Sequence, residues 1–138
     1  MIARHSVIRW SDDLRVGIDF IDQDHQDAVE AINRMAAAAH DGQSVLADLE
    51  AFHHHCALHF GREEDLMRQV GFFALEPHCG EHERVLAEMD LILERVRAGE
   101  SCSDYFTEAL PQWFLEHRAT MDFVTADFAR SRGWEDAV

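Results

Sequence analysis

The sequence predicts an all-α fold, an up-down-up-down antiparallel four-helix bundle with an N-terminal arm. Three observations support this prediction: apolar residues recur at steps of three and four, strand-type alternation is scarce, and only two prolines occur, Pro77 and Pro111. Short segments that contain glycine interrupt the helical pattern. Because helices joined by short links pack as antiparallel neighbours, a bundle is the expected architecture.

Each predicted helix has its own apolar stripe. The stripes cover residues 18–39, 45–70, 75–96 and 106–128. Ser44 can cap the second helix. A glycine follows each stripe, in the order Gly42, Gly71, Gly99 and Gly133. Because Pro111 lacks a backbone donor, we expect the fourth helix to kink there or to restart at that residue.

We expect a single domain, since 138 residues can bury one core but are too few for two ordinary domains. Within it, residues 18–133 form the bundle, residues 1–17 an arm lying across it, and residues 134–138 a tail. The three cysteines show no CxxC spacing, so we expect reduced thiols at Cys56, Cys79 and Cys102.

The chain is strongly acidic, with 27 Asp and Glu residues against 12 Lys and Arg and a formal net charge of −15. Such a surface repels phosphate backbones and anionic lipids, which argues against nucleic-acid and membrane partners. Residues 1–10 contain no apolar run of signal-peptide length, and no stretch approaches the roughly 18 apolar residues of a membrane span. We therefore expect a cytoplasmic protein.

Seven side chains of metal-ligand type lie in or beside the apolar stripes. They are His25, His59, Glu63, His78, His82, His117 and Asp122. His59 and Glu63 are spaced i, i+4, as are the two histidines of the third stripe, which places each pair on one helix face. His117 and Asp122 are spaced i, i+5, an offset of roughly 140° on an α-helix, so they can share only a wide site.

The seven positions also fall at similar heights in an antiparallel bundle. His25 and His59 are each 17 residues from Gly42 (42 − 25 and 59 − 42). The other ligand-type residues differ in their distance from the nearest turn by about one helical turn, at ~1.5 Å per residue.

Buried carboxylates without partners are strongly unfavourable, and cations remove that cost. Five imidazoles and two carboxylates are too many for one tetrahedral zinc and lack the all-oxygen character of a calcium site. They suit a pair of first-row metals, with iron the best candidate.

The motifs that carry these residues resemble the hemerythrin family. They are Gly17-Ile18-Asp19 with Asp22-Gln23-Asp24-His25, His59-Phe60-Gly61-Arg62-Glu63-Glu64, His78-Cys79-Gly80-Glu81-His82, and Trp113 with His117 and Asp122. They stand in the family's order and span nearly the whole chain. A single H-x-x-x-H or H-F-x-x-E motif is weak evidence, whereas the ordered set is specific.

The resemblance implies two iron ions joined by an oxo or hydroxo bridge. It implies His78, His82 and His117 on one iron, His25 and His59 on the other, and Glu63 and Asp122 as bridges. The second iron keeps an open position, at which dioxygen binds reversibly for oxygen carriage, storage or sensing. We expect an apolar pocket around that position, with walls from Trp113, Phe114, Ile21 and Phe60.

Three positions depart from the family pattern. Phe114 stands where leucine is common, Arg118 where isoleucine is frequent, and Thr125 where tyrosine is often found. These departures bear on pocket size, solvent access and the lifetime of the oxygenated form. They keep open the alternative of a di-iron redox enzyme on the same scaffold, reducing peroxide or nitric oxide.

A ferritin-like di-iron oxidase is a poorer match. Such proteins present two Glu-x-x-His motifs, and this chain offers one, Glu50 to His53, outside the core stripe. The run of histidines at 53–55 is interpreted as a surface feature. Within it only His55, one turn before His59, is placed to approach the ligand layer.

Overall fold

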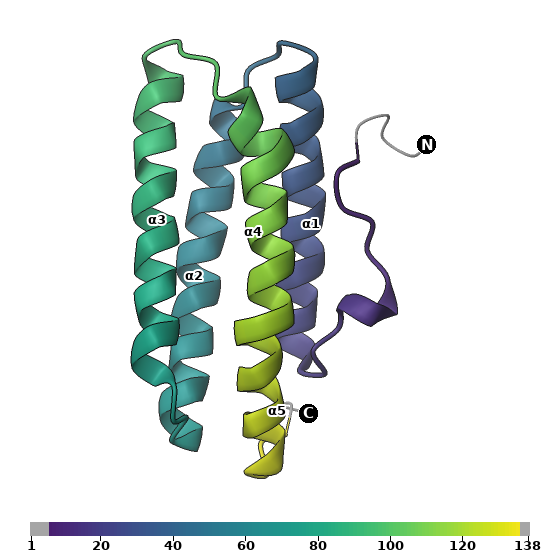
Figure 1. The fold of residues 1–138 in the computed structure, drawn as a ribbon, viewed down its shortest axis with the longest axis vertical. Helices are drawn as coiled ribbons and strands as arrows, with labels where there is room; N and C mark the ends of the chain where they lie inside the picture. Colours follow the sequence, from purple (N-terminus) through teal and green to yellow (C-terminus); the bar gives the residue numbers. More distant parts are fainter. Residues whose placement is uncertain (1–5, 136–138) are drawn as a thin grey trace.

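The computed structural model describes residues 6–135, and in that range the chain is an antiparallel helical bundle with no strand (Figure 1). The predicted fold class is confirmed. Three long helices are followed by a fourth helical run assembled from four segments. The elements are α1 (Asp19–His40), α2 (Leu46–Val70), α3 (Leu75–Arg97), η2 (Tyr105–Ala109), α4 (Leu110–His117), η3 (Arg118–Asp122) and α5 (Phe123–Ser131). A short 3-10 turn, η1 (Asp12–Leu14), lies in the N-terminal arm.

The helix ends follow the local signals in the sequence. The Ser44 hydroxyl accepts a hydrogen bond of 3.3 Å from the backbone N–H of Leu46, at the first residue of α2. That helix ends at Gly71, which adopts a φ of 66°, and the N–H of Phe72 then reaches back to the carbonyl of Met67 at 2.9 Å. A left-handed residue at this point costs least as glycine, so the chain reverses here without strain.

The fourth helical run is continuous through Pro111, and its α-helical pattern restarts beside that residue, at Leu110, close to the restart expected from the sequence. Residues 103–131 stay helical, and the π-helical segment η2 leads directly into α4, with Pro111 in its first turn. A π-helical turn bonds residue i to residue i+5 and so shifts the register of the backbone hydrogen bonds. This change in register accommodates the missing proline donor without ending the helix.

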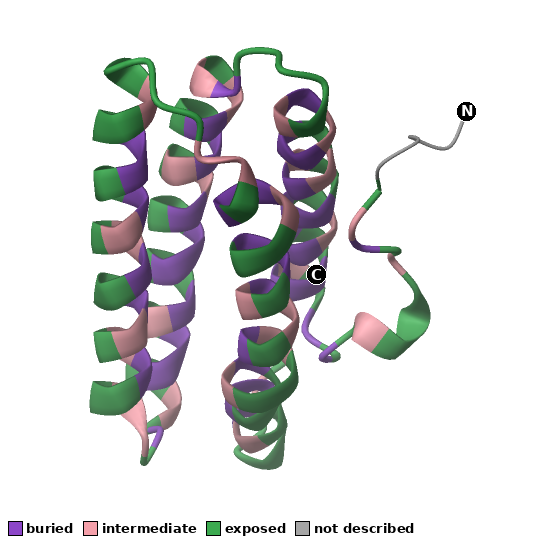
Figure 2. Ribbon diagram, turned by 45° about the horizontal axis from the view of Figure 1, so that its top comes forward, coloured by how far each residue is buried: buried purple, intermediate pink, exposed green. Residues whose placement is uncertain are grey.

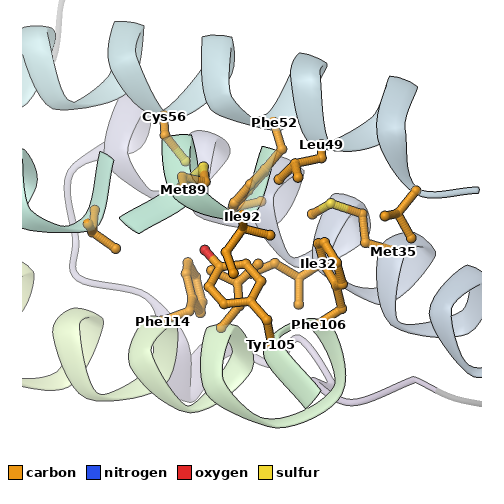
Figure 3. Packing of buried hydrophobic residues seen from close by; sticks show 14 of the residues in the cluster. Ile32, Met35, Leu49, Phe52, Cys56, Met89, Ile92, Tyr105, Phe106 and Phe114 are labelled. Atoms are coloured by element: carbon orange, nitrogen blue, oxygen red, sulfur yellow. The ribbon is translucent and has the colours of Figure 1, made fainter. Parts of the chain in front are cut away.

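Buried residues lie on the inward faces of all four helical runs (Figure 2) and form two apolar clusters, the larger of which is shown in part in Figure 3. The larger cluster includes Ile32, Met35, Leu49, Phe52, Met89, Phe106 and Phe114. The smaller one consists of Val16, Ile18, Ile21, Leu66, Ala126 and Ala129. Along α1, α2 and the fourth helical run, the ligand-type residues lie between members of the two clusters, so a polar layer crosses the bundle.

The N-terminal arm runs beside α1 (Figure 1). The Asn33 carboxamide oxygen accepts hydrogen bonds from the N–H groups of Val7 and Ile8 at 2.9 and 3.0 Å, and the two oxygens of Asp22 accept those of Val16 and Gly17. Residues 1–5 of the predicted arm and 136–138 of the predicted tail lie outside the described residues. Among the described helices, none has the apolar stretch needed to cross a membrane.

Candidate metal centre

The seven ligand-type side chains come together in one buried layer. None has more than 6% of its surface exposed, and Glu63 has 0%. Their ligand atoms form two groups whose members lie within 4.8 Å of one another. The first group is Glu63, His78, His82, His117 and Asp122, and the second is His25, His59 and Asp122.

Asp122 belongs to both groups, and its two oxygens face different histidines. Oδ1 lies 3.0 Å from Nε2 of His117 and 3.2 Å from Nε2 of His78, whereas Oδ2 lies 2.9 Å from Nε2 of His25. Glu63 Oε1 faces the first group, at 3.1 and 3.0 Å from Nε2 of His78 and His82. A carboxylate with one oxygen turned to each of two ligand groups is suited to bridging a pair of cations.

A second π-helical segment explains how His117 and Asp122 reach the same site. The five residues of η3 follow His117 and end with Asp122. Because a π-helical turn spans five residues, their i, i+5 spacing places both side chains on one face. An undistorted α-helix would separate them by roughly 140°.

Several buried polar atoms of the layer have no hydrogen-bond partner among the described residues. They include both Glu63 oxygens, Asp122 Oδ1 and the Nε2 atoms of His59 and His82. The short nitrogen–oxygen separations within the layer therefore do not satisfy these atoms. Buried polar groups are rarely left unpaired, and the donor set of imidazole nitrogens and carboxylate oxygens suits first-row metal cations. The layer thus fits metal ions.

Three of the histidines are oriented by a partner on their other ring nitrogen. His59 Nδ1 lies 2.8 Å from Asp24 Oδ2, His82 Nδ1 lies 2.9 Å from Glu64 Oε2, and His78 Nδ1 lies 2.9 Å from Thr125 Oγ1. Since the two carboxylates and the Thr125 hydroxyl can each accept an Nδ1 proton, the Nε2 atom of each ring faces the layer. Outer partners of this kind fix the ring and raise its basicity as a ligand. Sequence reasoning did not identify these three partners.

The charges of the layer shift its pKa values. Burial raises the pKa of Glu63 and Asp122, but the facing imidazoles outweigh burial, so both pKa values fall below their usual range. Burial lowers the pKa of His78, yet the adjacent carboxylates of Asp122 and Glu63 raise it to about 9. The pKa of His59 rises as well, because its bond to Asp24 and the nearby carboxylates outweigh burial. The layer therefore favours positive charge.

A small cavity of about 20 Å³ adjoins the second ligand group. His25 and His59 line it, as do Phe60, Trp113 and Phe114 of the predicted pocket. Phe114 packs edge-on against the His25 ring, with centroids 5.3 Å apart. A cavity of this size holds about one water-sized molecule.

Ile21 was predicted to line this pocket, and the structure places it elsewhere. It packs in the smaller apolar cluster with Ile18 and Leu66. The cavity lies on the side of His25 that faces Ala28, whereas Ile21 is one turn away in the opposite direction. Arg118 also lies outside the lining residues, and its guanidinium donates a 3.4 Å hydrogen bond to the Asp13 carbonyl of the arm.

The four consecutive residues from His53 to Cys56 lie partly at the surface and partly at the cavity. His53 pairs with Asp90 at 2.9 Å, and His54 is exposed. His55 and Cys56 both line the cavity, although only His55 was expected to approach the layer. Cys56 occupies an apolar stripe position, which indicated burial but could not distinguish the cavity wall from the core.

Comparisons with known proteins agree with this site. The family model described as Hemerythrin HHE cation binding domain matches residues 16–129. A bacteriohemerythrin of Stenotrophomonas maltophilia is 32% identical, covering 94% of this chain and 93% of the relative. A bacteriohemerythrin of Ralstonia nicotianae is 30% identical, covering 92% of each chain.

Solved structures show the same fold at lower identity. Crystal structures of hemerythrin with a leucine-to-alanine or a leucine-to-tyrosine substitution each match with a TM-score of 0.84 and 19% identity. Each match covers 90% of this chain and 98% of the solved one.

Proposed function

We propose that this chain, which belongs to the hemerythrin family, holds two iron ions in its ligand layer and binds dioxygen reversibly in the adjoining cavity. The observation that carries the proposal is the division of the ligand atoms into two groups joined by Asp122. One tetrahedral ion cannot use seven ligands, whereas two ions sharing carboxylates can.

The ligand groups differ in their number of histidines. His78, His82 and His117 would hold one iron, and His25 and His59 the other. Asp122 would bridge the two, and Glu63, whose Oε2 has no hydrogen-bond partner among the described residues, would supply the second carboxylate bridge. The ion with two histidines would therefore keep a free coordination position.

The cavity adjoins the two histidines that would hold this second iron. Both of them line it, whereas of the three histidines in the first group His117 does and His78 and His82 do not. When bound, the two irons supply the electrons that dioxygen accepts reversibly. The chain's own contribution is the apolar part of the wall, including Phe52 and Phe114, which are 2% and 5% exposed and separate the cavity from bulk water.

The carboxylates and outer hydrogen bonds prepare the layer for this role. The negative charges of Glu63 and Asp122 offset the charge of bound cations. The bonds from His59 to Asp24 and from His82 to Glu64 hold Nε2 of each ring toward the layer, so little reorganisation is required when metal binds.

Metal analysis tests the proposal. Protein purified without added metal and then reconstituted anaerobically with ferrous iron is expected to retain two irons per chain after desalting. One zinc per chain, or no retained iron after reconstitution, would contradict it.

A further inference from the structure

The wall of the cavity consists mostly of buried residues. Twelve residues line it, and ten of them are buried. The two half-buried ones are His55, on α2 where it faces α1, and Trp113, on α4. Because they are the most exposed of the lining residues, they mark the two places where a small molecule has the shortest way into the cavity.

Trp113 is firmly held. Its Nε1 donates a 2.9 Å hydrogen bond to Glu81 Oε1, and its ring stacks on His117 with centroids 4.7 Å apart and an interplanar angle of 19°. Glu81 is itself fixed by Arg84, at 2.6 Å. Displacement of Trp113 would therefore disturb a candidate ligand and an ion pair together.

His55 is held by fewer contacts. Its Nε2 lies 3.2 Å from the backbone carbonyl of Asp24, and since a carbonyl only accepts, the imidazole donates this hydrogen bond. The bond connects α2 to α1 across the seam between them. The ring lies nearly parallel to Phe52 and His59 on its own helix, both with centroids 6.4 Å away. Outward rotation would break one hydrogen bond and displace no residue of the ligand layer.

We propose that His55 is the gate of the cavity: its imidazole closes the seam between α1 and α2 through the Asp24 carbonyl, and its rotation admits and releases small ligands. That the admitted ligand is dioxygen rests on the proposed function, whereas the gate itself depends only on the cavity and its wall.

Cys56 provides a reporter of the gate, because it lines the same cavity and is 5% exposed. Burial raises the pKa of its thiol, so alkylation requires the cavity to open. The full chain is treated with iodoacetamide, and the alkylation of each cysteine is followed by peptide mass spectrometry. Cys79 and Cys102, which do not line the cavity, are internal controls.

Two variants open the gate in different ways. His55→Ala removes the ring, and His55→Phe keeps a ring against Phe52 but cannot donate to the Asp24 carbonyl. Both are expected to raise Cys56 alkylation about fivefold or more, the factor expected from loss of one neutral hydrogen bond. His54→Ala, which removes the adjacent exposed imidazole, is expected to leave the rate unchanged. The proposal is overturned if neither His55 variant raises the rate, or if His54→Ala raises it equally.

Azide binding to the iron-loaded, oxidised chain gives a second readout. A gate changes the association and dissociation rates by the same factor and leaves the dissociation constant unchanged, as expected for both variants. If Trp113→Phe accelerates alkylation and azide binding while the His55 variants do not, the entrance lies at Trp113 and the proposal is wrong. Because alkylation needs no iron, failure to bind iron would count against the proposed function alone.

Discussion

Thr125 provides a test of the outer hydrogen bonds at a single buried atom. Its side chain accepts the Nδ1 proton of His78 at 2.9 Å and donates weakly to the sulfur of Met67 at 3.9 Å. Thr125 is 0% exposed and His78 2%. Thr125→Val keeps the side-chain shape but leaves the His78 N–H without its acceptor, where water cannot replace it.

The expected size of the effect follows from that burial. An unsatisfied buried N–H costs about 1–3 kcal/mol. Loss of an outer partner of a metal-binding histidine lowers metal affinity by about 10- to 100-fold, or about 1.4–2.7 kcal/mol. Thr125→Val is therefore expected to weaken ferrous iron binding within this range, whereas Thr125→Ser, which retains the hydroxyl, stays near wild type.

Anaerobic competition with a chromogenic ferrous chelator measures the affinity. Thr120→Val is the matched control, because Thr120 is exposed and its hydroxyl donates to the Glu116 carbonyl at 2.7 Å, away from the layer. Equal iron affinity in Thr125→Val and wild type would refute the orienting role of the hydroxyl. An equal loss of iron affinity in Thr120→Val would mean that the effect comes from a change in the helix and not from the hydrogen bond to His78.

Three further predictions concern the ligand layer and its wall. Glu63→Ala is expected to lose most of its iron and His55→Ala to keep it; the reverse result in metal analysis would mean that the assigned register of α2 is wrong. Because the pKa of His78 in the metal-free chain is about 9, above its value of about 6.5 in the unfolded chain, metal must displace its proton. Zinc affinity should therefore rise with pH up to about 9 and then level off. Calorimetry at pH 7.5 in buffers of different ionisation enthalpy should detect the release of protons when zinc binds. If no protons are released, the raised pKa of His78 is contradicted. Phe114→Ala is expected to lower the free energy of unfolding, measured with urea, by about 3–5 kcal/mol. Phe123→Ala should lower it by about 1 kcal/mol or less, because Phe123 is 44% exposed. Similar losses in the two variants would show that the Phe114 side chain does not fill the wall of the cavity.

Periodicity was sufficient to predict the bundle and to bring the ligand residues to one layer. A stripe of period 3.6 identifies which face of a helix is buried, so histidines and carboxylates within a stripe had to meet in the interior. The equal distances of His25 and His59 from Gly42 also indicated that the two residues lie at the same level along the bundle axis. Both kinds of information are local in sequence, which is why they could be obtained without a structure.

The parts that could not be predicted depend on the backbone path and on packing between helices. The i, i+5 spacing of His117 and Asp122 marked a difficulty, but the π-helical turn that resolves it is a change of hydrogen-bond register with no composition signature. Ile21 was assigned to the pocket because a stripe gives the face of a residue but not the side of the layer on which a cavity lies. The partners Asp24 and Glu64 depend on helix rotation, which the sequence does not specify.

The most direct test of the account is the absorption spectrum of the iron-loaded, anaerobically reduced chain through cycles of dioxygen and argon. We expect a visible band that appears with dioxygen, disappears under argon and returns on the next exposure, with one dioxygen taken up per pair of irons. A chain that binds two irons but only oxidises, with no band that argon removes, would contradict reversible binding and favour the redox-enzyme alternative.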